Sequence, residues 1–411
     1  MWVIDARAIL VTTTWRADPS WAAGAEFRRT AALVEVTTDE GVSGLGETVM
    51  GYFCPEVVPP LVGWARELLV DRTLGLDPTQ PERVFDELAQ RCRWWGHSGL
   101  ALSVLSGVEM ALWDIAGKAA GKPVHALLGG AAHARLPAYA SGGTGAWPLE
   151  RTVEQARHYV DAGFRALKLG TGYEGRPGSR STGVAPAPYG TWYAPTTPGR
   201  VADEVAKLSA LREALGADLE LALDTHAVQV RDPWDRAAAL ALARAIEPFE
   251  LLFWEEPLRY EDPEGYAELR RRAGVPIAGG ECLAGVDEFR RFLDLEALDF
   301  VQPDASHAGG ITVTRRVADL AGARGVGLIV HTGASIGPGL MANLHAAFAS
   351  PSARAVEVAL APDNVRRELL VEPLNYEDGD LLAPAAPGLG VRLPPGFREA
   401  NPFVGGAVEY A

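Results

Sequence analysis

The sequence predicts an α/β protein, in which a parallel β/α barrel follows a smaller N-terminal α+β domain. Two observations predict the barrel. From Pro137 onward, short apolar runs alternate with helical patterns, which is typical of β/α units. The runs also end in charged or metal-binding side chains, at Lys168, Asp224, Glu255, Glu281, Asp304, His331 and Glu357.

The side chains at these seven strand ends indicate a functional site. In a parallel barrel the carboxyl ends of the strands meet at one mouth, where active sites are built. A barrel has no structural reason to end seven successive strands with such side chains. The pattern therefore predicts an enzyme. The chain of 411 residues is long enough for a barrel of about 250 residues and a further domain.

The first 128 residues follow a different pattern. Ala31 to Thr38 and Gly41 to Glu47 read as two strands of a hairpin, with Glu40-Gly41 near its turn. Helical patterns follow around 58–70, 81–92 and 100–120. Strands followed by helices are typical of an α+β domain. We therefore expect a capping domain over residues 1–128.

The barrel is expected over residues 129–375. Its predicted helices are Thr152–Ala162, Val201–Leu215, Trp234–Ile246, Pro263–Ala273, Gly285–Leu293 and Thr312–Arg324. After Glu357 the regularity fades into chain rich in Pro and Gly. We expect residues 376–411 to return to the capping domain.

One long segment interrupts the barrel pattern. Residues 171–200 are rich in Gly, Pro, Ser and Thr, with aromatic and arginine side chains among them. A structureless loop of about 30 residues is uncommon in a compact domain and is usually functional or disordered. Because it follows Lys168 directly, we expect a lid or a loop that contacts substrate; the alternative is an insertion with no role.

Composition narrows the class of partner. The net charge of −15 argues against a nucleic-acid partner, which calls for a basic face. Cys54, Cys92 and Cys282 lack metal-type spacing, and their odd number fits reduced thiols. We see no signal peptide and no apolar run near the roughly 20 residues that span a membrane. We therefore expect a cytoplasmic protein with no membrane partner.

Three carboxylates predict a metal site. Asp224, Glu255 and Glu281 end three successive strands, and at one mouth they would repel one another unless a cation lies between them. Ligands that are all oxygen favour a hard divalent ion, Mg²⁺ first and Mn²⁺ second. The alternative is three independent surface acids.

A histidine and an aspartate predict acid–base chemistry. Asp304 and His331 end neighbouring strands, one β/α unit apart. A carboxylate bonded to one ring nitrogen fixes the tautomer and raises the basicity of the other nitrogen, as a general base requires.

Several motifs together resemble the enolase superfamily, in its mandelate racemase-like branch. The metal signatures are Asp224-Thr-His226, Trp254-Glu-Glu-Pro257 and Gly279-Gly-Glu281. Further similarity lies in Gly41-Val-Ser-Gly-Leu-Gly-Glu47, Ala111-Leu-Trp-Asp114, Gly117-Lys-Ala-Ala-Gly-Lys-Pro123 and Leu127-Leu-Gly-Gly130, so it extends over most of the chain. The resemblance implies a modified TIM barrel of the (β/α)7β type with an N-terminal α+β capping domain.

The resemblance also implies roles for residues at the mouth. It makes Glu255, rather than Glu256, the metal ligand, and it supports a His331–Asp304 dyad. Lys168 matches a lysine that supports the substrate carboxylate. Relatives commonly carry Lys-x-Lys there, but here the third position is Gly170, so the usual second base is missing.

Three further roles are implied by relatives. His226 resembles the acid that protonates a leaving hydroxyl in some sugar-acid dehydratases; the alternative is a hydrogen bond to a carboxylate. Glu357 resembles a carboxylic acid that donates a hydrogen bond to the substrate carboxylate, which needs a raised pKa; the alternative is a salt bridge to Lys168 or an arginine. Cap loops select substrate in this family, and they would here include Trp15 and Tyr52; the alternative is an apolar interface between cap and barrel.

These residues suit removal of a proton α to a carboxylate. His331 takes the proton, and a metal, Lys168 and Glu357 stabilise the enediolate. Since Gly170 removes the expected second base and His226 can act as an acid, we predict dehydration of an aldonate or aldarate to a 2-keto-3-deoxy acid. The substrate is a small carboxylate and the cofactor Mg²⁺, with Mn²⁺ possible.

Three alternatives stay open. One is a racemase or epimerase on the same scaffold, with a loop tyrosine or His226 as second base. Another is a sugar-acid-binding protein without catalysis, and a third is a metal-dependent hydrolase, disfavoured because such sites usually include histidine ligands. The resemblance further implies a homo-oligomer.

Overall fold

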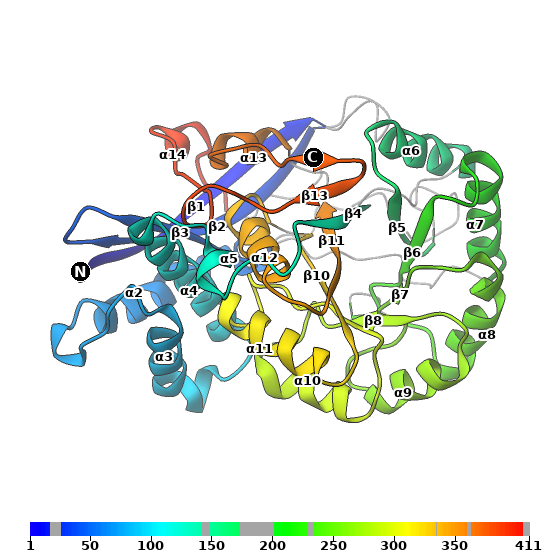
Figure 1. Cartoon of the computed structure of the whole chain (residues 1–411), viewed down its shortest axis with the longest axis horizontal. Helices are drawn as coiled ribbons and strands as arrows, with labels where there is room; N and C mark the ends of the chain where they lie inside the picture. Colours follow the sequence, from blue (N-terminus) through cyan, green and yellow to red (C-terminus); the bar gives the residue numbers. More distant parts are fainter. Residues whose placement is uncertain are drawn as a thin grey trace.

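The computed structural model in Figure 1 describes residues 1–16, 26–141, 148–172, 201–228, 233–333, 335–359 and 363–405. The N-terminal part is a sheet packed on helices, and the rest is a closed barrel beside it. The fold class predicted from the sequence is therefore confirmed.

The N-terminal sheet has three antiparallel strands in the order β1-β2-β3. They are β1 (Val3–Arg16), β2 (Glu26–Thr38) and β3 (Ser43–Thr48). The predicted hairpin joins β2 and β3, and Gly41 takes a positive φ of 79° in its turn, a conformation that glycine adopts without steric cost.

In the described part of the chain, five α-helices accompany this sheet. They are α1 (Met50–Phe53), α2 (Val58–Leu69), α3 (Pro81–Gly96), α4 (Gly99–Ala120) and α5 (Val124–Leu127). Strand β3 lies directly on α4, since a Cβ at Gly46 would stand 1.9 Å from the carbonyl oxygen of Gly107. Only glycine permits two backbones to approach this closely.

The sequence-based expectation about apolar segments overlooked α4. Gly99–Ala120 is 22 residues long and apolar enough to cross a membrane, by length and composition only. In the fold, 89% of its most apolar stretch is buried inside the protein. Its apolar composition is explained by packing on all sides, against β3, α3 and α11, rather than by a lipid environment.

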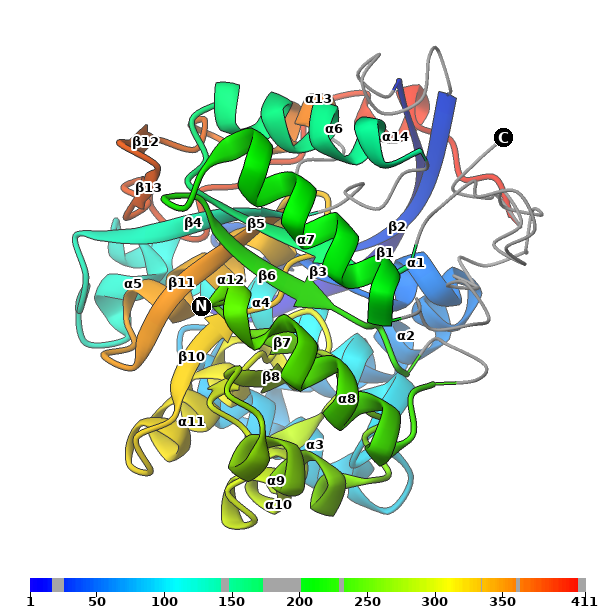
Figure 2. The ribbon, with the colours of Figure 1, turned by 90° about the vertical axis from the view of Figure 1, so that its right-hand side faces the viewer.

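The barrel has eight parallel strands, and its last strand pairs with its first. In order they are β4 (Arg135–Ser141), β5 (Ala166–Gly170), β6 (Glu220–Asp224), β7 (Trp254–Glu255), β8 (Ile277–Gly279), β9 (Phe300–Val301), β10 (Gly327–Val330) and β11 (Ala353–Ala359). The helices between them are α6 (Leu149–Asp161), α7 (Val201–Leu215), α8 (Arg236–Ile246), α9 (Pro263–Arg272), α10 (Gly285–Asp294), α11 (Gly310–Gly322) and α12 (Pro338–Phe348). Figure 2 shows these helices around the strands.

The barrel interior explains where the functional side chains point. One layer of buried side chains fills it, comprising Tyr139, Ala166, Ala222, Phe253, Ala278, Ile329 and Ala355. Side chains alternate along a strand, so the residue two positions later also faces inward, one layer closer to the mouth. Two positions after five of these residues stand Lys168, Asp224, Glu255, His331 and Glu357.

The chain continues after β11 into short elements on the outside of the barrel. They are α13 (Asp363–Leu369), β12 (Tyr376–Glu377), β13 (Asp380–Leu382) and α14 (Phe397–Ala400). Strand β13 pairs antiparallel with the start of β4. Beyond α14, the amide of Val404 donates to Thr12 Oγ1 at 2.9 Å, so the end of the described chain lies against β1.

Candidate active site

The structure brings the predicted metal ligands together at the barrel mouth. One carboxylate oxygen from each of Asp224, Glu255 and Glu281 lies within 4.8 Å of the other two. Asp224 and Glu255 are fully buried. Glu281 Oε2 is buried and accepts no hydrogen bond, although His331 Nε2 stands 3.4 Å away. Oxygen donors at this spacing, with Asp224 Oδ2 and Glu281 Oε2 both lacking a hydrogen bond, fit a hard divalent cation such as Mg²⁺.

Lys168 lies in the middle of the acids. Its Nζ is 2.9 Å from both carboxylate oxygens of Glu255, 3.2 Å from Asp224 and 3.1 Å from Glu357. Burial opposes its charge, but Glu255, Glu357 and Asp224 outweigh burial and raise the pKa of Lys168 well above its ordinary value. The lysine is therefore held as a cation beside the metal ligands.

Glu357 differs from the expectation. Burial raises the pKa of its carboxyl, but Lys168 and His331 outweigh burial, so the pKa is lowered. Its Oε2 also accepts a hydrogen bond of 2.8 Å from the amide of Thr332. The expected raised pKa is wrong for this arrangement, and the salt bridge to Lys168, which was the alternative, is what the structure shows.

His226 contacts Asp224 through an unusual backbone conformation. Strand β6 ends at Asp224, and His226 takes a φ of 48°, so strand alternation does not place it. Its Nε2 lies 3.0 Å from Asp224 Oδ2. Burial lowers the pKa of His226, but Asp224 outweighs it and raises that pKa to about 9. A protonated imidazole suits proton donation.

His331 and Asp304 form a hydrogen-bonded pair. His331 Nδ1 lies 2.9 Å from Asp304 Oδ2, which leaves Nε2 directed toward Glu281. The other oxygen of Asp304 accepts hydrogen bonds from Asn343 Nδ2 at 2.9 Å and from Ser306 Oγ at 2.7 Å. Because Asp304 is fixed at both oxygens, the imidazole is held in one orientation.

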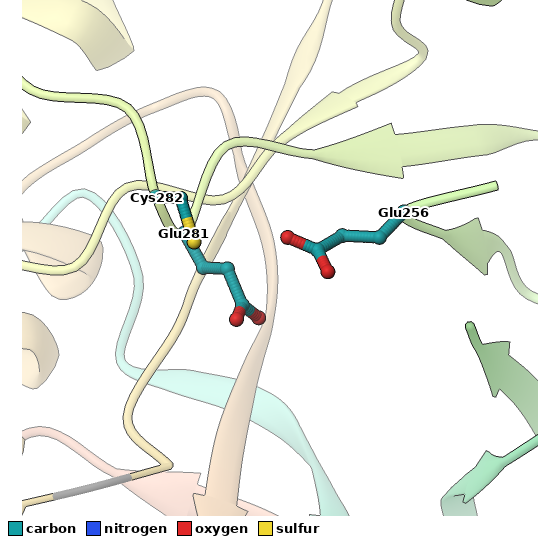
Figure 3. Close-up of side chains that lie close together, drawn as sticks. All are labelled: Glu256, Glu281 and Cys282. Carbon is teal, nitrogen blue, oxygen red and sulfur yellow. The ribbon is translucent and has the colours of Figure 1, made fainter. Parts of the chain in front are cut away.

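Glu256 is the second acid of the Glu-Glu pair, and it does not join Lys168. It is fully buried, and burial followed by repulsion from Glu281 raises the pKa of Glu256 well above its ordinary value. The nearby Tyr260 hydroxyl lowers the pKa of Glu256, but it does not form a hydrogen bond with either carboxylate oxygen. Figure 3 shows the Glu256 side chain extending toward Glu281 and Cys282.

Gly170 leaves space at the mouth. It stands two positions after Lys168 and pairs in register with Asp224. A Cβ at this position would meet no atom of the described residues within 4 Å. The fully buried Lys207 donates to the carbonyl oxygens of Gly170 and Gly172 at 2.8 and 2.7 Å, which fixes the chain as it leaves β5. Residues 173–200, the rest of the predicted loop, lie outside the described residues.

The predicted substrate contacts from the cap are only partly described. Tyr52 belongs to the short helix α1, not to a loop, and its ring is buried under the guanidinium of Arg29 at 5.3 Å. Arg29 in turn donates to the carbonyl oxygen of Gly333, two residues after His331. Trp15 lies in β1 rather than in a loop, and its side chain is outside the described part of the structure.

Two residues that help to position the site had no role predicted from the sequence. Gln302 Nε2 donates to Glu255 Oε2 at 2.7 Å, and Gln302 follows the inward-facing Phe300 by two positions, so the strand period could have found it. Glu47 of β3 accepts amide hydrogen bonds of 2.7 to 3.2 Å from Ile336, Gly337 and Gly339. The cap thereby holds the segment that follows His331.

Comparison with known proteins identifies the family. Residues 5–129 match the mandelate racemase/muconate lactonizing enzyme N-terminal domain, and residues 151–396 match the enolase C-terminal domain-like family. These two matches cover the capping sheet and the barrel from β5 to β11.

Curated relatives and a solved structure agree with these matches. The chain is 34% identical to the D-galactonate dehydratase of Ralstonia nicotianae, over 93% of this chain and 91% of the relative. It is 29% identical to the arabinonate dehydratase of Saccharolobus solfataricus, over 91% of each. A racemase from Streptomyces coelicolor A3(2) with bound magnesium superposes with a TM-score of 0.78 at 28% identity, covering 97% of this chain and 98% of the racemase.

The motifs of the sequence, the barrel with its capping sheet and the matched domains agree. The chain belongs to the mandelate racemase/muconate lactonizing enzyme family of the enolase superfamily.

Proposed function

We propose that this protein dehydrates a sugar acid, an aldonate or aldarate, to a 2-keto-3-deoxy acid with the help of Mg²⁺. The observation that carries the proposal is the pair of histidines on opposite sides of the mouth. His331 follows β10 and His226 follows β6, which are the seventh and third strands of an eight-stranded barrel. The names of the two dehydratase relatives support the same reaction class.

The contacts of the two histidines support their roles in this reaction. His331 Nε2 is free of Asp304 and faces Glu281, which supports its role as the group that takes a proton from the carbon next to a bound carboxylate. His226 Nε2 lies against Asp224 on the opposite side of the mouth, which supports its role as the group that gives a proton to the departing hydroxyl. Burial lowers the pKa of both rings, but the surrounding carboxylates outweigh burial and raise it, so a cation bound by those carboxylates would be needed before His331 acts as a base.

The reaction then balances within these residues. The α C–H bond breaks and its proton goes to His331, a C=C bond forms, and the β C–O bond breaks. His226 protonates the oxygen, which leaves as water, and the enol product becomes the 2-keto acid. Lys168 adds a fixed positive charge beside the substrate carboxylate. A divalent ion held by Asp224, Glu255 and Glu281 would supply the larger share of that charge.

A racemase or epimerase is the second candidate, since two histidines on opposite sides could also exchange a proton across one carbon. The solved racemase with bound magnesium is consistent with that chemistry on this scaffold. Gly170 favours dehydration, because the lysine that usually serves as second base is replaced by open space. A cytoplasmic location and a homo-oligomer stay predictions.

The deciding experiment incubates the protein with Mg²⁺ and a library of aldonic and aldaric acids in D₂O. We expect 2-keto acid from one substrate class. Deuterium in recovered substrate without keto acid would instead establish an epimerase. No change across a wide library would favour the sugar-acid-binding protein.

Two variants assign the histidines. His331→Asn removes the base and should lower turnover by about 10²- to 10⁴-fold. His226→Asn should slow keto-acid formation by about 10²-fold while deuterium still enters the substrate. Mg²⁺ binding, measured by equilibrium dialysis, should survive both changes. Equal loss of exchange and elimination in His226→Asn would contradict its assignment as the acid.

A further inference from the structure

Glu256 has no hydrogen-bond partner among the residues that the structure describes. Its side chain is fully buried, and neither carboxylate oxygen has a hydrogen bond. Glu256 takes part in none of the ion pairs found among the described residues, whereas its neighbour Glu255 is bonded to Lys168 and Gln302. A buried carboxylate without a partner is strongly unfavourable, so this oxygen pair calls for a compensating group.

The direction of the side chain shows where that group would lie. Figure 3 shows Glu256 extending from the end of β7 toward Glu281 and Cys282, which follow β8. One carboxylate oxygen of Glu256, one of Glu281 and the sulfur of Cys282 all lie within 4.8 Å of one another. Metal bonds of about 2.0 to 2.3 Å place opposite ligands about 4 to 4.6 Å apart, so one ion could contact all three after small side-chain movements.

Among the described residues, no basic side chain forms an ion pair with Glu256. Lys168, the lysine among these acids, directs its Nζ at Asp224, Glu255 and Glu357 rather than at Glu256. The two ring nitrogens of His331 lie near Glu281 and Asp304 rather than near Glu256. Among the described residues, Glu256 is therefore the mouth acid that neither the lysine nor a histidine neutralises.

We propose that Glu256, Glu281 and Cys282 form a second divalent-cation site. It differs from the site of Asp224, Glu255 and Glu281 in having a sulfur ligand. A sulfur donor selects a softer ion than Mg²⁺, such as Zn²⁺ or Co²⁺. On binding, the thiol of Cys282 loses its proton to solvent and the thiolate becomes the ligand.

Glu281 links the two sites, because it belongs to both sets of ligands. An ion on one side fixes the Glu281 carboxylate for the other, so occupancy of the two sites is coupled. A thiophilic ion at the second site should therefore change the affinity of the first site for Mg²⁺, whatever substrate the enzyme uses.

The test adds Co²⁺ to the whole protein in saturating Mg²⁺. Thiolate-bound Co²⁺ gives a charge-transfer absorption in the near ultraviolet, and oxygen ligands alone do not. We expect this band in the wild type, with two divalent ions per chain by equilibrium dialysis and elemental analysis. One ion per chain without the band would overturn the proposal and show that Glu256 is kept as a neutral acid.

Two variants locate the second ion. Cys282→Ser should abolish the band and weaken the second ion by at least about tenfold, and Glu256→Gln should weaken it while keeping a band. Cys54→Ser is the matched control, since Cys54 is also a free, partly buried cysteine but belongs to neither of the metal-ligand groups found among the described residues. A band that persists in Cys282→Ser, or disappears in Cys54→Ser, would overturn the assignment.

Thermal unfolding gives a second readout that does not depend on the spectrum. Co²⁺ in saturating Mg²⁺ should raise the Tm of the wild type and of Cys54→Ser, because an ion that binds only the folded state stabilises it. The increase should be lost in Cys282→Ser and Glu256→Gln. An equal increase in all four proteins would show that Co²⁺ acts only at the first site.

Discussion

Two groups of buried carboxylates occupy different regions of the molecule and are satisfied in different ways. At the interface between cap and barrel, each acid accepts hydrogen bonds from backbone amides, and Asp114 is also paired with Lys118. At the mouth, the acids face one another, a lysine and two histidines. The interface acids are Glu47, Glu109 and Asp114, and the mouth acids are Asp224, Glu255, Glu256 and Glu281.

Glu109 shows how complete the satisfaction is at the interface. It lies on α4, and its two oxygens accept from the amides of Ile311 and Thr312 at 2.8 Å and from the indole of Trp113 at 2.7 Å. Those amides open α11, where the helix dipole favours a negative charge. Glu47 does the same at the start of α12, the helix after His331.

The comparison separates buried acids that hold the fold from buried acids that serve chemistry. When an acid surrounded by amides is removed, the folded protein loses hydrogen bonds. When an acid surrounded by other acids is removed, the folded protein loses electrostatic repulsion, and it also loses a ligand for a cation. The two regions should therefore respond in opposite ways to mutation.

The largest expected effect is on activity, at the mouth. Glu281→Gln removes one charge from the predicted metal ligands, so turnover should fall by about 10³-fold, which corresponds to about 4 kcal/mol. The Tm without added cation should be nearly unchanged, because Glu281 Oε2 accepts no hydrogen bond. Steady-state kinetics and thermal unfolding with and without Mg²⁺ test both parts. A large loss of Tm without cation would place Glu281 with the interface acids.

The reverse pattern is expected at the interface. Glu109→Ala leaves the amides of Ile311 and Thr312 and the Thr312 hydroxyl without this acceptor, so the free energy of unfolding should fall by about 3 kcal/mol. Turnover per folded molecule should stay within about twofold, since the hydrogen bonds of Glu109 among the described residues go to α4 and α11 and not to the mouth. Urea unfolding followed by circular dichroism gives the stability, and a loss of kcat at low temperature in fully folded protein would contradict the distinction.

The pH dependence of stability gives a smaller effect with a definite sign. Burial raises the pKa of Glu47 to about 7, above its ordinary value of 4.5. The folded state therefore binds a proton more tightly than the unfolded state, and this group's contribution to stability falls as pH rises from about 4.5 to 7.

The Gln variant isolates that contribution. Glu47→Gln does not titrate, so its stability relative to the wild type should improve between pH 4.5 and 7.5, by about 3 kcal/mol. Urea unfolding of both proteins across this range measures the difference in their free energies of unfolding. His345, whose pKa burial lowers to about 3, changes stability with pH in the opposite direction, but its contribution is the same in both proteins and cancels in the difference. A difference that is constant with pH would mean that Glu47 titrates normally in the folded protein.

The sequence predicted the mouth better than the interface, for a physical reason. Asp224, Glu255, His331 and Glu357 are placed by strand period alone, because each stands two positions beyond a side chain that fills the barrel. Strand order in a parallel barrel then brings them to one mouth without knowledge of any loop.

Long-range backbone contacts could not be predicted in the same way. Glu109 meets Ile311 only because Gly310 has a positive φ, and a Cβ there would stand 2.0 Å from the Glu109 carboxylate. The Gly309-Gly310 pair was the available signal, but it does not say which acid approaches. His226 likewise reaches Asp224 through its own φ of 48°, and the partner of Glu357 depends on where Lys168 points.

The smallest expected effect is at Gly170, beside the mouth acids. Because a Cβ there meets nothing within 4 Å, Gly170→Ala should change the free energy of unfolding by no more than about 0.5 kcal/mol and leave turnover within about twofold. Chemical unfolding and steady-state kinetics test this. A clear loss of stability would show that the backbone, rather than open space, requires glycine here.

Gly170→Lys uses the same space to change the chemistry. Relatives commonly carry a second lysine at this position, and a lysine beside Asp224 would restore a base on the side of the mouth that now has His226. We expect this variant to fold with nearly wild-type stability and to form some epimer of the substrate together with the keto acid. Nuclear magnetic resonance in D₂O detects both products. A stable variant that forms only keto acid would show that a second lysine is not enough to convert dehydration into epimerisation. The mouth acids and His226 would then be what commits the intermediate to elimination.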